Sequence, residues 1–122
     1  MIYSESKLFV GDNSGAKRVK CIKVLKASKR SGGKPTNIAI VSIRKVKRSK
    51  RLLKGHICKG VLVRLKKNTQ RDTGSSIKFS VNSIILIDAK NVPLGSRVFG
   101  PVFKEIRFEN FPKLLSLSKT LL

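Results

Sequence analysis

The chain has 122 residues, which is enough for one domain and too few for two domains of ordinary size. Its 28 Lys and Arg residues against 6 Asp and Glu residues give a net charge of +22, and 40% hydrophobic residues exclude a wholly disordered chain. No apolar run approaches the length of a membrane-spanning helix, which excludes such a helix, and the self-repulsion of so many cations predicts a polyanionic partner, nucleic acid.

The first half of the chain predicts short strands separated by turns and loops. Residues 7–10 form an apolar run that ends in a dense turn cluster at residues 11–15. Residues 18–26 and 37–46 are typical of strands, and the second is rich in β-branched side chains and apolar on both faces. Residues 45–60 hold 7 basic residues, and this charge predicts an excursion away from the core.

Strand patterns continue in the second half. Residues 60–65 predict a strand with Val61, Val63 and Leu65 on one face, and residues 83–88 predict a buried strand. Residues 66–76 contain the Asn, Asp and Gly residues typical of a β-ribbon tip. Residues 77–82 alternate apolar and polar side chains, which predicts a half-buried strand with Phe79 facing inward. Short strands at this spacing, with no repeat and no linker, predict a single all-β domain over the whole chain, built as a small closed barrel.

The periodicity changes near the C-terminus. Phe111, Leu114 and Leu115 are spaced as on one face of a helix, and Pro112 suits the first position of that helix. We therefore expect one or two short helices within a tail at about residues 102–117.

The positive charge is concentrated in one segment. Residues 17–71 carry 20 Lys or Arg residues and no Asp or Glu, whereas the other 67 residues carry 8 basic and 6 acidic side chains. A surface that serves only solubility mixes both signs of charge. Enrichment of one sign within a segment that folds predicts binding to a phosphate backbone.

Residues suited to catalysis or metal binding are sparse. Cys21 and Cys58 are too far apart for any zinc-binding spacing, so we expect reduced, partly buried thiols. His56 is the only histidine, and no carboxylate lies near it in sequence to orient it as a general base. We expect no catalytic residue, no metal site and no cofactor. A pocket that brought Asp12, His56 and Cys58 together would instead favour an RNA-modifying enzyme.

The aromatic residues bear on the kind of nucleic acid. The chain has six Phe, one Tyr and no Trp, and proteins that read single strands stack bases on exposed aromatic side chains. Phe79 lies on the inward face of its expected strand, and Phe103 and Phe111 fit core positions of the expected helices. We therefore expect the aromatic residues to serve packing, with Lys and Arg contacting the backbone of a folded RNA.

Several motifs are similar to those of a known family. Residues 12–16 read Asp-Asn-Ser-Gly-Ala, and residues 21–25 read Cys-Ile-Lys-Val-Leu. Residues 95–102 read Gly-Ser-Arg-Val-Phe-Gly-Pro-Val and are followed by Glu105 and Arg107. Over essentially the whole chain, the sequence resembles the universal large-subunit ribosomal protein number fourteen, bacterial or organellar type.

The internal signature of that family is also matched, with two departures. Residues 60–63 read Gly-Val-Leu-Val and precede a turn at residues 73–74. Thr73 stands where Asp, Asn or Ser is usual, and Ile85 stands where Val is usual, so only the conformation of the turn is in doubt. The matched positions after the turn are Phe79, Asn82 and Leu86.

This resemblance implies a five-stranded β-barrel with a protruding β-ribbon and a C-terminal helical part. It implies a structural constituent of the large ribosomal subunit that binds large-subunit rRNA and contributes to inter-subunit bridges with small-subunit rRNA. The implied neighbours are ribosomal proteins three and nineteen, and a ribosome-silencing factor docks on members of the family. By motif match, the bridge and docking face includes Ser96, Arg97 and Lys113, where the family has Thr in place of Ser96.

The charge pattern also predicts the RNA contacts. Phosphate binding requires cations that the fold brings to its surface, and the segment over residues 17–71 supplies most of them. The residues expected to bind RNA are Lys17, Arg18, Lys29, Arg30, Arg44, Lys47, Arg48, Lys50, Arg51, Arg64, Lys66, Lys67 and Arg71.

The composition further suggests a compartment. The high charge and the heavy use of Lys and Ile resemble a family member encoded in an AT-rich organelle genome. Residues 1–9 include Glu5 and lack an apolar segment, so we expect neither a secretory signal nor a transit peptide. We expect a ribosome of the mitochondrial matrix rather than one of the bacterial cytoplasm or a plastid.

Two other functions stay open alongside the ribosomal one. A free-standing basic β-barrel that acts as an RNA chaperone would leave ribosomes in moderate salt, whereas an assembled component would stay bound. The RNA-modifying enzyme would require the pocket described above.

Overall fold

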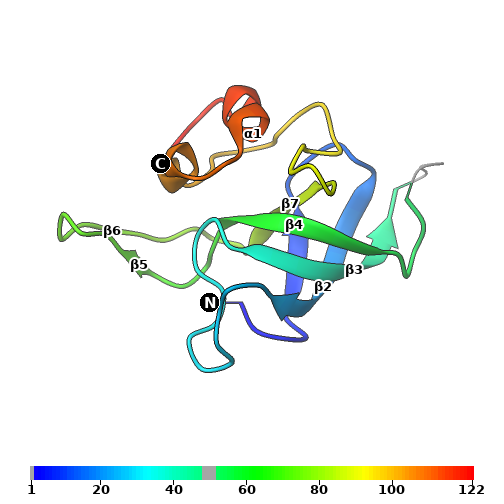
Figure 1. Cartoon of the computed structure of the whole chain (residues 1–122), viewed down its shortest axis with the longest axis horizontal. Helices are drawn as coiled ribbons and strands as arrows, with labels where there is room; N and C mark the ends of the chain where they lie inside the picture. The colour runs from blue at the N-terminus through cyan, green and yellow to red at the C-terminus, as the bar shows by residue number, and fades with distance from the viewer. Residues whose placement is uncertain (1, 48–51) are drawn as a thin grey trace.

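A closed β-barrel forms the centre of the molecule in the computed structural model, which describes residues 2–47 and 52–122 (Figure 1). Neighbouring barrel strands are antiparallel except β1 and β7, whose parallel pairing closes the barrel. This arrangement confirms the predicted small five-stranded barrel. In barrel order, the strands are β1 (Lys7–Val10), β2 (Ala16–Val24), β3 (Ile38–Val46), β4 (Ile57–Arg64) and β7 (Ser83–Ile87).

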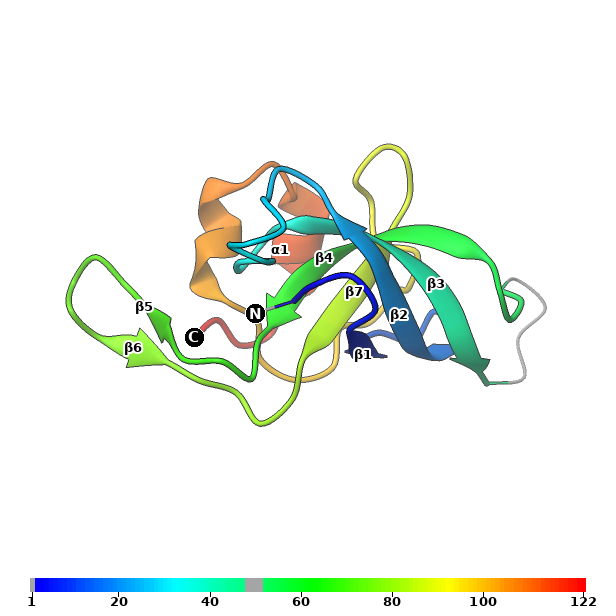
Figure 2. The same ribbon diagram turned by 90° about the horizontal axis from the view of Figure 1, so that it is seen from below.

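A two-stranded ribbon projects from the barrel between β4 and β7, as predicted (Figure 2). It consists of β5 (Thr69–Gln70) and β6 (Ser76–Ile77), which pair in antiparallel fashion. The strand expected over residues 77–82 was wrong, because regular pairing ends at Ile77. The alternation of burial is nevertheless present there, and Phe79 is half-buried against the barrel core.

The chain between the ribbon and β7 is held by individual hydrogen bonds rather than by a regular ladder of backbone pairs. The Phe79 N–H donates to the Leu65 carbonyl at 3.1 Å, and the Lys66 N–H donates to the Asn82 side-chain oxygen at 2.7 Å. A side chain thus takes the place of a backbone acceptor, which interrupts the strand while keeping its inward residues inward.

The C-terminal part contains two short helices, within the range expected from the sequence. A 3-10 helix, η1 (Lys104–Phe108), precedes α1 (Pro112–Leu117), in which Pro112 occupies the first turn as predicted. Proline is favoured at that place because its fixed φ suits the helix and its missing N–H would have had no partner. Both helices cover one side of the barrel (Figure 1).

Two apolar clusters explain why β4 and β7 read as continuous hydrophobic runs. One cluster fills the barrel and includes Leu62, Ile84 and Leu86. The other lies between the barrel and the C-terminal helices and includes Val61 and Ile85. Because successive side chains of a strand point to opposite faces, a strand between two cores is apolar at every position.

Strand limits differ from the predicted ones at two places. Strand β2 spans Ala16–Val24 instead of residues 18–26, and its pairing with β3 contains register shifts. Strand β4 begins at Ile57, three residues before its expected start, because residues 57–59 pair with β3 although they lie in the basic segment expected to leave the core. Tertiary pairing here overrides the local hydrophobic pattern.

An ion pair ties the ribbon to the C-terminal part. The Arg71 Nε atom lies 2.7 Å from Glu105 Oε1, its Nη2 atom lies 3.3 Å from Oε2, and Nη2 also donates to the Leu122 carbonyl. A two-pronged guanidinium–carboxylate pair of this kind orients both groups.

Glu105→Gln should therefore loosen the ribbon. We expect faster amide hydrogen exchange over residues 69–77 and a loss of about 1 kcal/mol in the free energy of unfolding, since the pair is only partly shielded from water. Exchange measured by mass spectrometry on the full chain checks this. Unchanged exchange in the ribbon would show that the ion pair does not hold it.

Candidate nucleic-acid interface

Seven cations gather on the outer side of the first three strands. All of them are exposed to solvent except Lys20, which is half-buried. They line two adjoining hollows, and Arg18 and Lys45 belong to both. We call this surface the β1–β3 basic face. Its members are Lys7, Lys17, Arg18, Lys20, Arg44, Lys45 and Lys47.

Strand register places like charges directly opposite one another on this face. Lys7 pairs with Lys20 across β1 and β2, and Arg18 pairs with Lys45 across β2 and β3. Directly opposed like charges on neighbouring strands destabilise a sheet. The face is therefore a region of stored repulsion that a polyanion would relieve.

Acidic side chains do not neutralise the basic face. The salt bridge between Arg71 and Glu105 is the only one among the residues that the structure describes, and it lies at the ribbon. Asp12 lines one of the hollows, but it is buried and its oxygens accept hydrogen bonds from Ser14 and Leu86. Burial raises the pKa of Asp12, and those hydrogen bonds oppose the rise.

The predicted RNA-binding residues are distributed over more than one region. Lys17, Arg18, Arg44 and Lys47 come together on the basic face. The remaining exposed members lie elsewhere. Lys29 and Arg30 occupy the loop between β2 and β3, and Lys66 and Lys67 follow β4 at the base of the ribbon. Arg48, Lys50 and Arg51 lie outside the described residues.

Two of the predicted residues are engaged inside the protein. Arg64 is half-buried and its Nη2 donates to the Ser83 hydroxyl at 3.0 Å, while Arg71 holds Glu105 as described above. Burial lowers the pKa of Arg64, because the charged form loses solvation. Both arginines therefore have a structural role that charge counting alone does not reveal.

Sequence reasoning missed three members of the basic face. The residues predicted to bind RNA do not include Lys7, Lys20 and Lys45, although Lys20 and Lys45 lie in strands with neighbouring cations. The sequence does contain a signal for each of them. Lys7 stands two positions before Phe9, Lys20 two positions after Arg18, and Lys45 next to Arg44. Only the pairing of β1 with β2 and of β2 with β3 shows that they share one surface.

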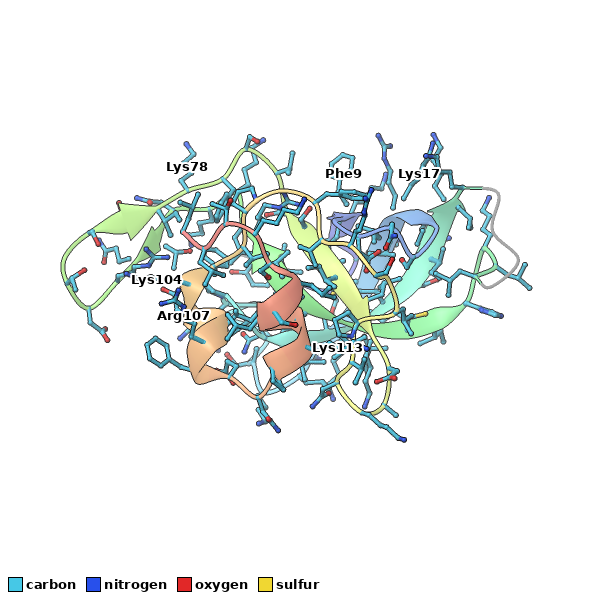
Figure 3. All side chains as sticks on the ribbon, turned by 90° about the horizontal axis from the view of Figure 1, so that it is seen from above. Phe9, Lys17, Lys78, Lys104, Arg107 and Lys113 are labelled. Atoms are coloured by element: carbon cyan, nitrogen blue, oxygen red, sulfur yellow. The ribbon has the colours of Figure 1, made fainter. Side chains whose placement is uncertain are left out.

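The expectation that aromatic side chains serve packing was wrong for half of the Phe residues. Phe79 and Phe103 do pack, with ring centroids 5.1 Å apart in an edge-to-face arrangement, and Phe111 is buried. In contrast, Phe9 is 44% exposed, and Phe99 and Phe108 are also exposed. Figure 3 shows Phe9 and Lys17 pointing outward on the same side of the barrel.

Ser96, Arg97 and Lys113 lie on two segments that share a core. Ser96 and Arg97 are exposed in the loop before Val98, and Lys113 is exposed in the first turn of α1 (Figure 3). Asn13 holds the loop, since its side-chain nitrogen donates to the Ser96 hydroxyl at 2.9 Å and its oxygen accepts from the Arg97 N–H at 3.0 Å. Val98 belongs to the same apolar cluster as the helix.

The described residues contain little that could perform catalysis. They include no group of three or more His, Cys, Asp or Glu side chains suited to a metal ion. His56 and Cys58 do not line the hollow that contains Asp12, and both cysteines are free, with Cys21 buried. Burial raises the pKa of both thiols, which disfavours the reactive thiolate. Helices long and apolar enough to cross a membrane are also missing from the described part.

Fold and surface together define a class of protein: a small, strongly basic closed β-barrel with opposed cations on its outer strands and a helical cover on one side. The family model of Ribosomal protein L14p/L23e matches residues 1–122, and the chain belongs to this family. It is a structural protein of the large ribosomal subunit. The family is structural rather than enzymatic.

Proposed function

We propose that this chain binds large-subunit rRNA through the β1–β3 basic face and neutralises phosphates there. The observation that carries the proposal is the pairing of Lys7 with Lys20 and of Arg18 with Lys45, with no acidic side chain exposed between them in the described residues. Such opposed charges destabilise the free protein and become favourable beside a phosphate backbone. The loop cations Lys29, Arg30, Lys66 and Lys67 extend the same interaction.

A second surface would serve contacts across the ribosome. Ser96, Arg97 and Lys113 form the part that we propose to face small-subunit rRNA in an inter-subunit bridge, and to accept a ribosome-silencing factor where one exists. Ribosomal proteins three and nineteen are the proposed protein neighbours, and the mitochondrial matrix is the proposed compartment. Family membership and the exposure of these three side chains support the bridge and docking face, and the heavy use of Lys and Ile supports the proposed compartment.

Salt dependence tests the RNA contacts. If the seven cations of the basic face each meet a phosphate, the slope of log affinity against log salt concentration for a large-subunit rRNA fragment should be about −6. Arg18→Gln combined with Lys45→Gln should make that slope shallower by about two and weaken binding to all RNA sequences alike.

A matched double variant on another surface is the control. Lys90 and Lys119 are exposed cations outside the basic face, so Lys90→Gln with Lys119→Gln should leave the slope nearly unchanged. A slope that is flat in the wild type, or equally reduced by both double variants, would contradict the assignment of this face. Release of the protein from large subunits by a moderate-salt wash would instead favour the free-standing RNA chaperone.

A further inference from the structure

A hollow on the basic face combines cations with exposed aromatic rings. Its volume is about 560 Å³, and it lies among β1, the start of β2, the end of β3 and the loop at Phe99. Phe9 and Phe99 line it and are 44% and 51% exposed. We call it the Phe9–Phe99 hollow. The cations that line it are Lys17, Arg18, Lys45 and Lys47.

The register of three strands arranges a ring and two cations in one row. Phe9 on β1 faces Arg18 on β2, and Arg18 in turn faces Lys45 on β3. The central guanidinium carbon of Arg18 lies 5.1 Å from the centroid of the Phe9 ring, within the range of a cation–π contact. This contact places the Arg18 guanidinium over one face of the Phe9 ring, and both groups line the hollow.

Backbone hydrogen bonds fix the rim before any ligand binds. The Phe99 N–H donates to the Gly11 carbonyl at 2.8 Å, which attaches the Phe99 loop to the end of β1. The Lys47 N–H donates to the Gly15 carbonyl at 2.7 Å, which attaches the end of β3 to the turn before β2. Because the rim is already ordered, less conformational entropy is lost when a ligand binds.

The lining leaves its cations free for an anion. Asp12 is the one acidic residue in the lining, and its carboxylate is buried and turned to Ser14 and the Leu86 N–H. A phosphate alone would use the cations but neither ring. An acidic peptide would use the cations through its carboxylates, which pair edge-on with guanidinium and ammonium groups and leave the faces of both rings uncovered.

We propose that the Phe9–Phe99 hollow binds one unpaired nucleotide of the RNA, with its base stacked on Phe9 or Phe99 and its phosphates held by the surrounding lysines. Base stacking on aromatic rings and on arginine planes is the usual way in which proteins hold unpaired RNA bases. The proposal rests on the proposed rRNA binding. It adds a preference for RNA with an unpaired nucleotide over fully paired RNA, which backbone contacts alone do not produce.

Two hairpin RNAs that differ only by one bulged nucleotide, absent from the fully paired one, test the inference with the full-length chain. The wild type should bind the bulged hairpin about tenfold more tightly, as expected for one stacked base. Phe9→Leu combined with Phe99→Leu should bring the two affinities together while keeping the affinity for the paired hairpin and its salt slope. Phe108→Leu changes an 85% exposed ring outside the hollow and should keep the preference.

A second measurement does not depend on a variant. A photoreactive 5-iodouridine at the bulge should crosslink to the peptide that contains Phe9 or to the one that contains Phe99, as identified by mass spectrometry. Equal affinity of the wild type for both hairpins, with a steep salt slope, would overturn the nucleotide hollow and leave the proposed rRNA binding intact. Failure to bind either hairpin at low salt would overturn the proposed rRNA binding itself.

Two further outcomes count against the hollow. A Phe9→Leu variant that loses the same affinity for both hairpins would show that Phe9 only supports Arg18, and the inference would fall. The other outcome combines two results: the wild type binds both hairpins equally, and an acidic peptide binds the wild type but not Phe9→Leu. Together they would assign the hollow to a protein partner instead.

Discussion

Asp12→Ala should lower the free energy of unfolding by about 3 kcal/mol, because its carboxylate accepts buried backbone hydrogen bonds that water cannot replace. Strand β1 ends at Val10, and the Gly11 N–H then donates to the Ile84 carbonyl of β7 at 2.9 Å. The next N–H of β7 on that side belongs to Leu86, and it donates to Asp12 Oδ2 at 3.2 Å. The side chain of Asp12 thus continues the ladder past the end of the strand.

The other carboxylate oxygen of Asp12 organises the turn that follows. Asp12 Oδ1 accepts the Ser14 N–H at 3.0 Å and also the Ser14 hydroxyl. Alanine would leave the Leu86 and Ser14 donors unpaired, one of them within the core. Equilibrium unfolding in urea measures the loss. Asp72→Ala removes an exposed carboxylate on the ribbon turn and should change stability by less than about 0.5 kcal/mol.

The pH dependence of this difference has a defined sign. Desolvation by burial raises the pKa of Asp12 in the folded protein, so the native state binds this proton more tightly than the unfolded chain does. The contribution of this titration to stability is therefore largest at low pH and is lost as the pH rises through the folded pKa. The gap in stability between wild type and Asp12→Ala should widen as the pH falls from 7 towards about 4. If the stability difference between wild type and Asp12→Ala narrows as the pH falls, the folded protein does not raise the pKa of Asp12.

Gly100→Ala should lower the free energy of unfolding by about 3 kcal/mol through two separate effects. Gly100 has φ of +77°, a left-handed conformation that costs an L-residue about 1–2 kcal/mol. In addition, a Cβ atom at this position would overlap Nη1 of Arg64. Arg64 would have to move, and its half-buried guanidinium would lose the hydrogen bond to Ser83 at a cost of about 1–3 kcal/mol.

Gly74→Ala separates the two effects of the Gly100 substitution. Gly74 has a similar φ of +85°, but no atom lies within 4 Å of the place that its Cβ would take. This variant should lose about 1 kcal/mol, which is the conformational part alone. Thermal or urea unfolding of both variants makes the comparison. Equal losses would show that Arg64 does not constrain the loop at Gly100.

Local hydrophobic patterns were sufficient to locate the strands that pack against an apolar core on at least one face. Apolar runs located β1, β3 and β7 to within one residue, and Pro112 located the start of α1. They failed after Ile77, where single long-range hydrogen bonds replace a regular ladder, and at the start of β4, where pairing extends into the basic segment. In each failure, the deciding partner lies on another part of the chain and leaves no periodic signal.

Local sequence patterns specify the barrel architecture and the sign of the surface charge. Hydrophobic periodicity specifies which segments become strands, and 20 cations without an acid over residues 17–71 specify a positive surface, because both properties depend on residues close together in the chain. Only the tertiary structure decided which cations act together. Pairing of β1, β2 and β3 brings Lys7, Arg18 and Lys45 onto one face, while the fold engages Arg64 and Arg71 inside the protein.

The same holds for the aromatic side chains. Phe9 and Phe99 are ninety positions apart in the chain and line one hollow because the Phe99 loop bonds to the end of β1. Composition predicts how many rings are present, whereas exposure depends on whether another segment covers each ring. Strand register turns Phe9 outward opposite Arg18, and the loop that holds Phe99 leaves its ring 51% exposed.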